Sequence, residues 1–550
     1  MTSAGLPSRR VVRLTLWVLA AAGLLVPILT LRWFPTPFAD LQLYASIAIS
    51  RHRFGIGVPS ITWNSPAAVD HIPFYGPVFF DLAAVALRVF DVRLVSFRLV
   101  SIAGTLLYLA ATLLLTRQFT RSIDRMLLAA VLVLLMPEVN FGMAAGAMHM
   151  LAVAFEVLAL AAFVKNFDRR RGGAGNGLAA GLCLSLAALT TPRSYPFVCA
   201  FACAALVPSI FGTARAAIRY RFAAAMVVLI AVMAGWAVIA HGSVAAWLNY
   251  MAYIAMHEDT DVAVLPTAVR RLSFHWSALL LPMAVTVFGA LAAWSMRRRL
   301  GPLLTGAAAG REASRDGALS FLIACAWIAL VITAVVLNYT FATNEYTSLP
   351  LFAVVVAWPW DAFAVPRRRI ALLTGVLLTI EVGLMVRRYT MIAVRWDALD
   401  PAPLNAFVAR YVPAGSAVVG TEEPFLFPVE RSGSIFRTQS PRSWADWARW
   451  VPAINPAATR LARSFPQPRP RDRFLIWPTG DDVPPGYECA LGSVVARFTP
   501  APPDPRWPEW IVRASNQYAG YPAATLYRLP DGCPSGYDPT RKPGPPRAAD

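Results

Sequence analysis

Long apolar runs separated by short polar segments dominate the first two thirds of the chain. Each run is close to the roughly 20 residues that a helix needs to cross the hydrocarbon core of a bilayer. We count about eleven such runs in the 550 residues. They lie at about 11–31, 97–116, 126–142, 147–164, 177–191, 196–211, 221–240, 275–295, 318–337, 347–364 and 370–386. Only 15% of the residues are charged, against about 25% in a typical soluble domain. The sequence therefore excludes a soluble enzyme and predicts an all-α polytopic membrane domain.

The basic residues predict the orientation of these spans. A net charge of +19 would point to a nucleic-acid partner in a soluble protein. Here most of the Lys and Arg residues before residue 389 fall in short clusters between the apolar runs, and cytoplasmic loops are the loops that retain such residues. We therefore expect no nucleic-acid partner and a cytoplasmic N-terminus. The same alternation places 32–96, 241–274 and 387–550 on the outer side.

Two stretches of the first outer segment, 40–54 and 74–90, are apolar without reading as spans. The second carries Asp81 and Arg88, and counting it as a twelfth span would move the basic cluster around Arg121 to the outside. We predict that both stretches form amphipathic helices lying on the outer face of the membrane.

The composition changes after residue 388. Residues 389–550 are rich in Pro, Trp and Arg, contain short strand-like runs at 416–420, 474–477 and 524–529, and lack any run that could cross a membrane. We predict a transmembrane domain at 1–388, a small α/β extracytoplasmic domain at 389–535 and a disordered Pro-rich tail at 536–550. The two cysteines of the second domain, Cys489 and Cys533, either form a disulfide in an oxidising compartment or remain two thiols.

Several residues of the first outer segment suit chemistry at a membrane surface. They are Asp40 and Tyr44 after the first span, His71, Pro73 and Tyr75 further on, and Arg93 and Arg98 at the entry to the second span. In this order they resemble the C-type (GT-C) glycosyltransferases, in particular the family 39/83-like branch of the protein O-mannosyltransferases and the lipid A aminoarabinose transferase. The resemblance continues at 177–192 and 344–350, so it covers most of the chain through short motifs.

The resemblance implies transfer of a sugar from a polyprenyl-phosphate donor. Such a transfer needs a carboxylate that accepts or orients a proton and cationic or donor groups that stabilise the leaving phosphate. The resemblance places the catalytic carboxylate on Asp40 and a phosphate contact on His71. Asp40 also stands where it would cap the helix that follows, a role compatible with the first. His71 lies beside Asp70 and would alternatively form a structural pair with it.

Further candidates face the outer side by this topology. Arg193, Arg270 and Arg271 would bind the donor phosphate, although interfacial arginines also reach to lipid headgroups. The expected substrate contacts are Tyr44, Tyr75, Glu138, His149, Glu345 and Tyr346. Glu138 or His149 would have to replace an acid that the family often carries at the start of the fourth span. Because that second acid is missing, we expect no requirement for a divalent metal and no cofactor.

The sequence therefore predicts an inverting hexosyl- or pentosyltransferase of the bacterial inner membrane. Its C-terminal domain would lie in the periplasm, and its acceptor would be a lipid, a glycan or a protein at that face. The alternative from another class is a carrier or flippase for a lipid-linked solute, with Glu156 and Glu381 inside spans as coupling groups. Such carriers show internal repeats, and none is visible here. A non-catalytic GT-C-like protein is a third reading, motivated by the missing acid.

Overall fold

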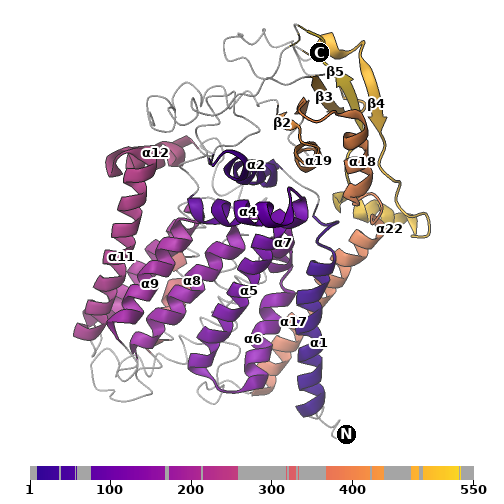
Figure 1. The fold of residues 1–550 in the computed structure, drawn as a ribbon. Coiled ribbons are helices and arrows are strands. Elements are labelled where there is room, and N and C mark those ends of the chain that lie inside the picture. The colour runs from indigo at the N-terminus through magenta and orange to yellow at the C-terminus, as the bar shows by residue number, and fades with distance from the viewer. Residues whose placement is uncertain are drawn as a thin grey trace, which may run out of the picture. The chain divides into compact units, whose positions relative to one another are not determined.

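Figure 1 shows the fold of the chain in a computed structural model. The structure describes residues 9–35, 39–55, 57, 76–167, 173–211, 215–257, 317–318, 321–326, 328–329, 332, 367–420, 424–438, 472–481, 483, 487–518, 520–531 and 533. The predicted spans 275–295 and 347–364, most of 318–337 and the predicted tail at 536–550 lie outside these residues.

The chain divides into two compact units. The first consists of Met1–Thr30, Val100–Trp236 and Ala255–Arg388. The second consists of Leu31–Leu99, Ala237–Ile254 and Tyr389–Asp550. The segment that follows the first predicted span therefore shares a unit with the C-terminal residues, although several hundred residues separate them in the sequence.

Among the described residues, three helices are long and apolar enough to cross a membrane: α1 (Arg9–Leu29), α5 (Leu94–Phe119) and α11 (Arg215–His241). Both α1 and α11 expose large apolar side chains, such as Leu14, which is 66% exposed, and Ile230, which is 65% exposed. Contact of such side chains with lipid tails has no cost in free energy, whereas their contact with water is unfavourable. The protein is a membrane protein.

The predicted span 126–142 is two helices. Here α6 (Ile123–Leu135) and α7 (Pro137–Ala145) meet at an angle of 61°. Pro137 is the first residue of α7, where its missing N–H is tolerated, whereas inside a continuous helix it would remove a hydrogen bond. Gly146 ends α7 in a left-handed conformation with φ 76°, as is common after a helix C-terminus.

Other predicted spans are helices as well. They are α8 (His149–Val164), α9 (Ala174–Ala188), α10 (Tyr195–Phe211) and α17 (Arg367–Val394). Buried residues of α1 and α6, among them Leu16 and Val131, form a core against which Val382 of α17 packs. The total of about eleven spans stays a prediction. The remaining helical elements are α12 (Val244–His257) and the 3-10 turns η3 (Lys165–Phe167), η8 (Glu488–Ala490) and η9 (Ser515–Tyr518).

The two helices predicted in the first outer segment are α2 (Ala39–Phe54) and α4 (Pro77–Phe90), which pack on one another (Figure 1). One face of α4 buries residues such as Phe79, and another exposes Val85 and Val89, as the expected interfacial helix does. In contrast, every residue of α2 from 41 to 50 is buried. The expected amphipathic pattern, with one buried and one exposed face, is therefore wrong for α2, because tertiary packing covers its small polar residues too. That the helix lies at the outer face of the membrane stays a prediction.

The C-terminal part of the second unit is a small α/β structure. Its sheet has the order β2-β1-β3-β5-β4, with β1 parallel to β2 and β3, and β5 antiparallel to β3 and β4. The strands are β1 (Ala417–Gly420), β2 (Ile435–Thr438), β3 (Arg473–Pro478), β4 (Val494–Phe498) and β5 (Ala524–Arg528). The helices are α18 (Pro401–Tyr411), α19 (Leu426–Arg431) and α22 (Glu509–Ala514). The three strand-like runs of the sequence are thus confirmed as β1, β3 and β5.

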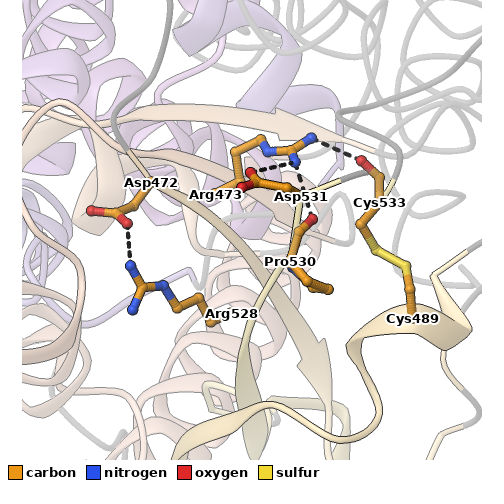
Figure 2. A network of polar contacts seen from close by, with 7 residues as sticks. All are labelled: Asp472, Arg473, Cys489, Arg528, Pro530, Asp531 and Cys533. Carbon is orange, nitrogen blue, oxygen red and sulfur yellow. Dashed lines mark hydrogen bonds and ion pairs between the residues drawn. A yellow bond between two sulfur atoms is a disulfide. The ribbon is translucent and has the colours of Figure 1, made fainter.

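A disulfide and several polar contacts hold the chain that follows β5 (Figure 2). Cys489 and Cys533 form a disulfide. Arg473 on β3 donates to the carbonyl oxygens of Cys533, at 2.8 Å, and of Pro530, at 3.1 Å. Cys533 is buried in a core cluster that includes Leu475. The chain that follows β5 is therefore fixed against β3 at several points.

Candidate functional site

Asp40 is the second residue of α2, and Tyr44 follows one helical turn later. Tyr44 is buried. Residues four apart lie on the same face of a helix, so the two positions share a face of α2. The structure starts α2 one residue before Asp40, whereas an N-cap residue precedes the first helical residue. The catalytic role of Asp40 stays a prediction.

The chain that leads to Asp40 is held by a buried arginine. Arg98, near the start of α5, has no exposed surface. Its guanidinium donates to the carbonyl oxygens of Leu31, at 2.6 Å, and of Phe34, at 3.3 Å, and also to that of Pro35. Arginine presents its donors in a rigid planar fork, so one side chain fixes three carbonyls of a single turn.

Arg98 is the functional residue whose role the sequence did not reveal. The sequence shows a basic entry to the second span, but the cationic character of that entry indicates no specific partner. In the structure the guanidinium binds main-chain oxygens of residues 31–35. Carbonyl partners carry no signature in a sequence, because every residue has one.

A second polar cluster lies in the first unit, where α8 meets the turn η4 (Pro192–Ser194). The Nη1 atom of Arg193 lies 3.1 Å from Nε2 of His149. A guanidinium only donates, so Nε2 is the acceptor and the imidazole is the neutral form in this contact. Thr191 caps the turn by accepting from the main-chain N–H of Arg193 at 3.4 Å. Two residues that the sequence proposed separately, a phosphate ligand and a substrate contact, are thus direct partners.

Glu156 belongs to the same face of α8. It lies seven residues after His149, which is two helical turns. Both Glu156 and Ser194 of η4 are buried.

The remaining predicted residues divide into two groups. Glu138 is the second residue of α7, and it belongs to the first unit with His149 and Arg193. His71, Tyr75, Arg270, Arg271, Glu345 and Tyr346 lie outside the described residues. Within the described ranges, no three or more His, Cys, Asp or Glu side chains gather closely enough to hold a metal ion.

No protein-family model matches the chain, and no curated protein matches it. Solved structures do. ArnT from Cupriavidus metallidurans in the apo state matches with a TM-score of 0.54 and 12% identity, over 96% of this chain and 100% of that one. The same protein bound to undecaprenyl phosphate matches with a TM-score of 0.41 and 10% identity, over 95% and 99%. The Archaeoglobus fulgidus oligosaccharyltransferase in complex with Zn and sulfate matches with a TM-score of 0.46 and 16% identity, over 84% of this chain and 68% of that one.

The match with apo ArnT concerns the fold. It extends over nearly the whole of both chains, with a TM-score of 0.54. ArnT has the GT-C fold, which the short motifs of the sequence already indicated. The resemblance is therefore confirmed at the level of the fold.

Proposed function

We propose that this protein is an integral-membrane glycosyltransferase that moves a sugar from a polyprenyl-phosphate donor to an acceptor on the outer face of the bacterial inner membrane. Asp40 is the proposed catalytic residue. The observation that carries the proposal is the placement of Asp40 in the first turn of α2, in the chain that follows the turn at residues 31–35 to which the buried Arg98 binds. A fold alone hosts many functions, so the proposal rests on this site within a GT-C fold.

The proposed reaction is a single displacement. The Asp40 carboxylate takes the proton of an acceptor hydroxyl, and the hydroxyl oxygen forms a bond to the anomeric carbon of the sugar. The bond between that carbon and the phosphate oxygen breaks on the opposite side, and polyprenyl phosphate leaves with the bonding electrons. One displacement inverts the anomeric configuration.

The leaving phosphate needs nearby donors. We assign this role to Arg193, which is oriented by His149 and by the cap from Thr191, together with His71, Arg270 and Arg271. Tyr44, Tyr75, Glu138, Glu345 and Tyr346 are the proposed sugar and acceptor contacts. No metal or other cofactor is part of the proposal.

The outer location is supported by the disulfide between Cys489 and Cys533, because structural disulfides persist in oxidising compartments such as the periplasm. We therefore place the C-terminal domain in the periplasm and the N-terminus in the cytoplasm.

The test uses purified wild-type protein in proteoliposomes with undecaprenyl phosphate that carries a radiolabelled hexose or pentose. Lipid, glycan and peptide acceptors are supplied in parallel. We expect the label to move from the donor to one acceptor with the opposite anomeric configuration while undecaprenyl phosphate accumulates. If the protein instead moves the intact donor between leaflets and leaves its sugar–phosphate bond unbroken, it is a carrier and the proposal is wrong.

A further inference from the structure

Residues just before Asp40 contact the C-terminal part of the second unit. Nη2 of Arg32 lies 2.9 Å from Oδ1 of Asp400, the residue that caps α18. The ring of Trp33 stacks on that of Trp396, with centroids 4.1 Å apart and an angle of 28° between the planes. The turn that Arg98 fixes on one side is therefore also bound by residues near 400.

Tyr521 extends this contact. Its main-chain N–H donates to the carbonyl oxygen of Ala398 at 3.2 Å, and its side chain is buried. Burial raises the pKa of Tyr521 to about 12, with the positive charges of Arg98 and Arg32 acting in the opposite direction. The phenol is therefore neutral at physiological pH and lies close to both arginines that hold the turn.

The other end of α2 is anchored in the same C-terminal residues. Arg53 donates from Nη2 to the carbonyl oxygen of Glu430 at 2.7 Å, and its Nη1 lies 2.6 Å from the Glu430 carboxylate. The Glu430 side chain is 1% exposed and accepts a hydrogen bond of 2.8 Å from the main-chain N–H of Phe436. The pair thus joins α2 to α19 and to the start of β2.

Inside α2, the amide of Gln42 and the hydroxyl of Ser50 are buried and have no hydrogen-bond partner in the described part of the chain. Arg51 pairs with Asp81 of α4, with 2.6 Å between Nε and Oδ1. The contacts of Arg32, Trp33 and Arg53 join this segment to the C-terminal residues, before the first residue of α2 and near its last.

We propose that the C-terminal domain is a positioning element for Asp40, which holds the chain on both sides of that residue through Arg32 with Asp400, Trp33 with Trp396, and Arg53 with Glu430. The assignment of Asp40 rests on the proposed function, whereas the clamp itself does not. A catalytic group displaced by about 1 Å loses about 100-fold in rate. Both attachments of this segment therefore bear on catalysis without touching the substrate.

The test compares variants of the full-length protein in nanodiscs. Arg53→Met removes both contacts to Glu430, and Arg53→Met with Glu430→Met also removes the buried carboxylate that would be left unpaired. The control is Arg513→Met, which breaks an ion pair with Glu509 in α22 whose side chains are 76% and 78% exposed. Hydrogen exchange of residues 39–50, kcat for sugar transfer and the Kd of undecaprenyl phosphate are measured for each.

We expect Arg53→Met to raise the exchange rate of residues 39–50 at least tenfold and to lower kcat at least tenfold, with the Kd of undecaprenyl phosphate unchanged. Arg513→Met changes none of the three. The double variant regains the thermal stability of the wild type and keeps the defect in kcat, which separates positioning from folding.

Two results would overturn the proposal: wild-type exchange of residues 39–50 in Arg53→Met, or wild-type kcat in the double variant. If the wild type itself transfers no sugar, the proposed function fails. The exchange measurement then decides alone whether the clamp exists.

Discussion

Within the residues that the structure describes, the guanidinium of Arg98 binds main-chain oxygens and no acidic side chain. A buried cation without a carboxylate depends on well-placed dipoles, and the carbonyls of Leu31, Phe34 and Pro35 provide them. The arginine is thereby tied to one conformation of the turn before Asp40. A lysine has a single ammonium on a flexible stem and cannot present the same planar fork.

Arg98→Met is expected to destabilise the second unit by about 2–4 kcal/mol, since hydrogen bonds to charged groups contribute roughly 1.5–3 kcal/mol each. Arg98→Lys should give an intermediate loss. Thermal unfolding in nanodiscs, followed by exchange of residues 31–35, checks this. The control is Arg93→Met, whose exposed ion pair with Asp91 contributes at most about 1 kcal/mol. Equal losses of stability in Arg98→Met and Arg93→Met would contradict the role of the buried Arg98 guanidinium.

Glu430 makes the attachment of α2 dependent on pH. Burial raises the pKa of Glu430 to about 7, above the ordinary value of 4.5, and outweighs the opposing effects of Arg53 and of the Phe436 N–H. A raised pKa in the folded state means that folding favours the protonated form, so its stabilisation is complete below pH 4.5 and is lost as the pH rises through about 7. His52 precedes Arg53 in the sequence, and burial lowers its pKa, with the charges of Arg88 and Arg53 acting in the same direction.

We therefore expect the opening of α19 and β2, measured by hydrogen exchange after correction for the intrinsic rate, to increase between pH 6 and 8 in the wild type. Glu430→Gln cannot titrate and should show no such increase. The same pH dependence in both proteins would assign the effect to another group.

Close helix packing in the first unit depends on two glycines one turn apart. A Cβ atom at Gly181 of α9 would lie 2.3 Å from the carbonyl oxygen of Ala225 in α11, and one at Gly177 would lie 2.4 Å from that of Arg221. Small residues at this spacing let two membrane helices approach closely. Main-chain atoms cannot move aside as a flexible side chain does.

Gly181→Ala should therefore destabilise the protein by about 1–3 kcal/mol, the usual cost of overpacking. The matched control is Gly235→Ala in α11, where a Cβ meets nothing within 4 Å. That change should be neutral or stabilising by up to about 1 kcal/mol, because alanine is the better helix former. Thermal unfolding of both variants tests this prediction. A Gly181→Ala variant with wild-type thermal stability would contradict the close approach of α9 and α11.

Elements with a local signal could be predicted from the sequence, and those defined by distant partners could not. The runs at 416–420, 474–477 and 524–529 are apolar and rich in β-branched or aromatic residues, and each forms a strand. In contrast, β4 was not predicted: four of its five residues are apolar, yet most of the strand is exposed. Pro137 inside the run 126–142 is a local signal for a break that the span count did not use.

The candidate site shows the same limit. The position of Asp40 after the first span was visible in the sequence, and the helix that starts there was expected. The burial of residues 41–50 of α2 has no such local signal. The helix is held by distant residues, such as Glu430, which pairs with Arg53 from 377 residues away. The pairing of His149 with Arg193 spans 44 residues and has no sequence pattern either.

For the whole molecule, the orientation in the membrane is the next claim to test. In a variant whose free cysteines Cys183, Cys199, Cys203 and Cys325 are replaced, single cysteines are placed at Arg121 and at Arg513. Both positions are exposed, and neither belongs to the proposed site. A membrane-impermeant maleimide applied to intact cells with a permeabilised outer membrane should label position 513 and spare position 121, and the reverse pattern would contradict the proposed topology.

The most direct test of the central claim is the rate of sugar transfer by Asp40→Asn. Removing a general base typically costs about 10²–10⁴-fold, so we predict a fall of at least 100-fold in kcat with undecaprenyl phosphate still bound at the wild-type Kd. Asp91→Asn is the matched control, because Asp91 lies in the same outer segment at an exposed helix end with φ 74°, which asparagine tolerates, and it should transfer at the wild-type rate. Wild-type transfer by Asp40→Asn would show that Asp40 is not the catalytic carboxylate.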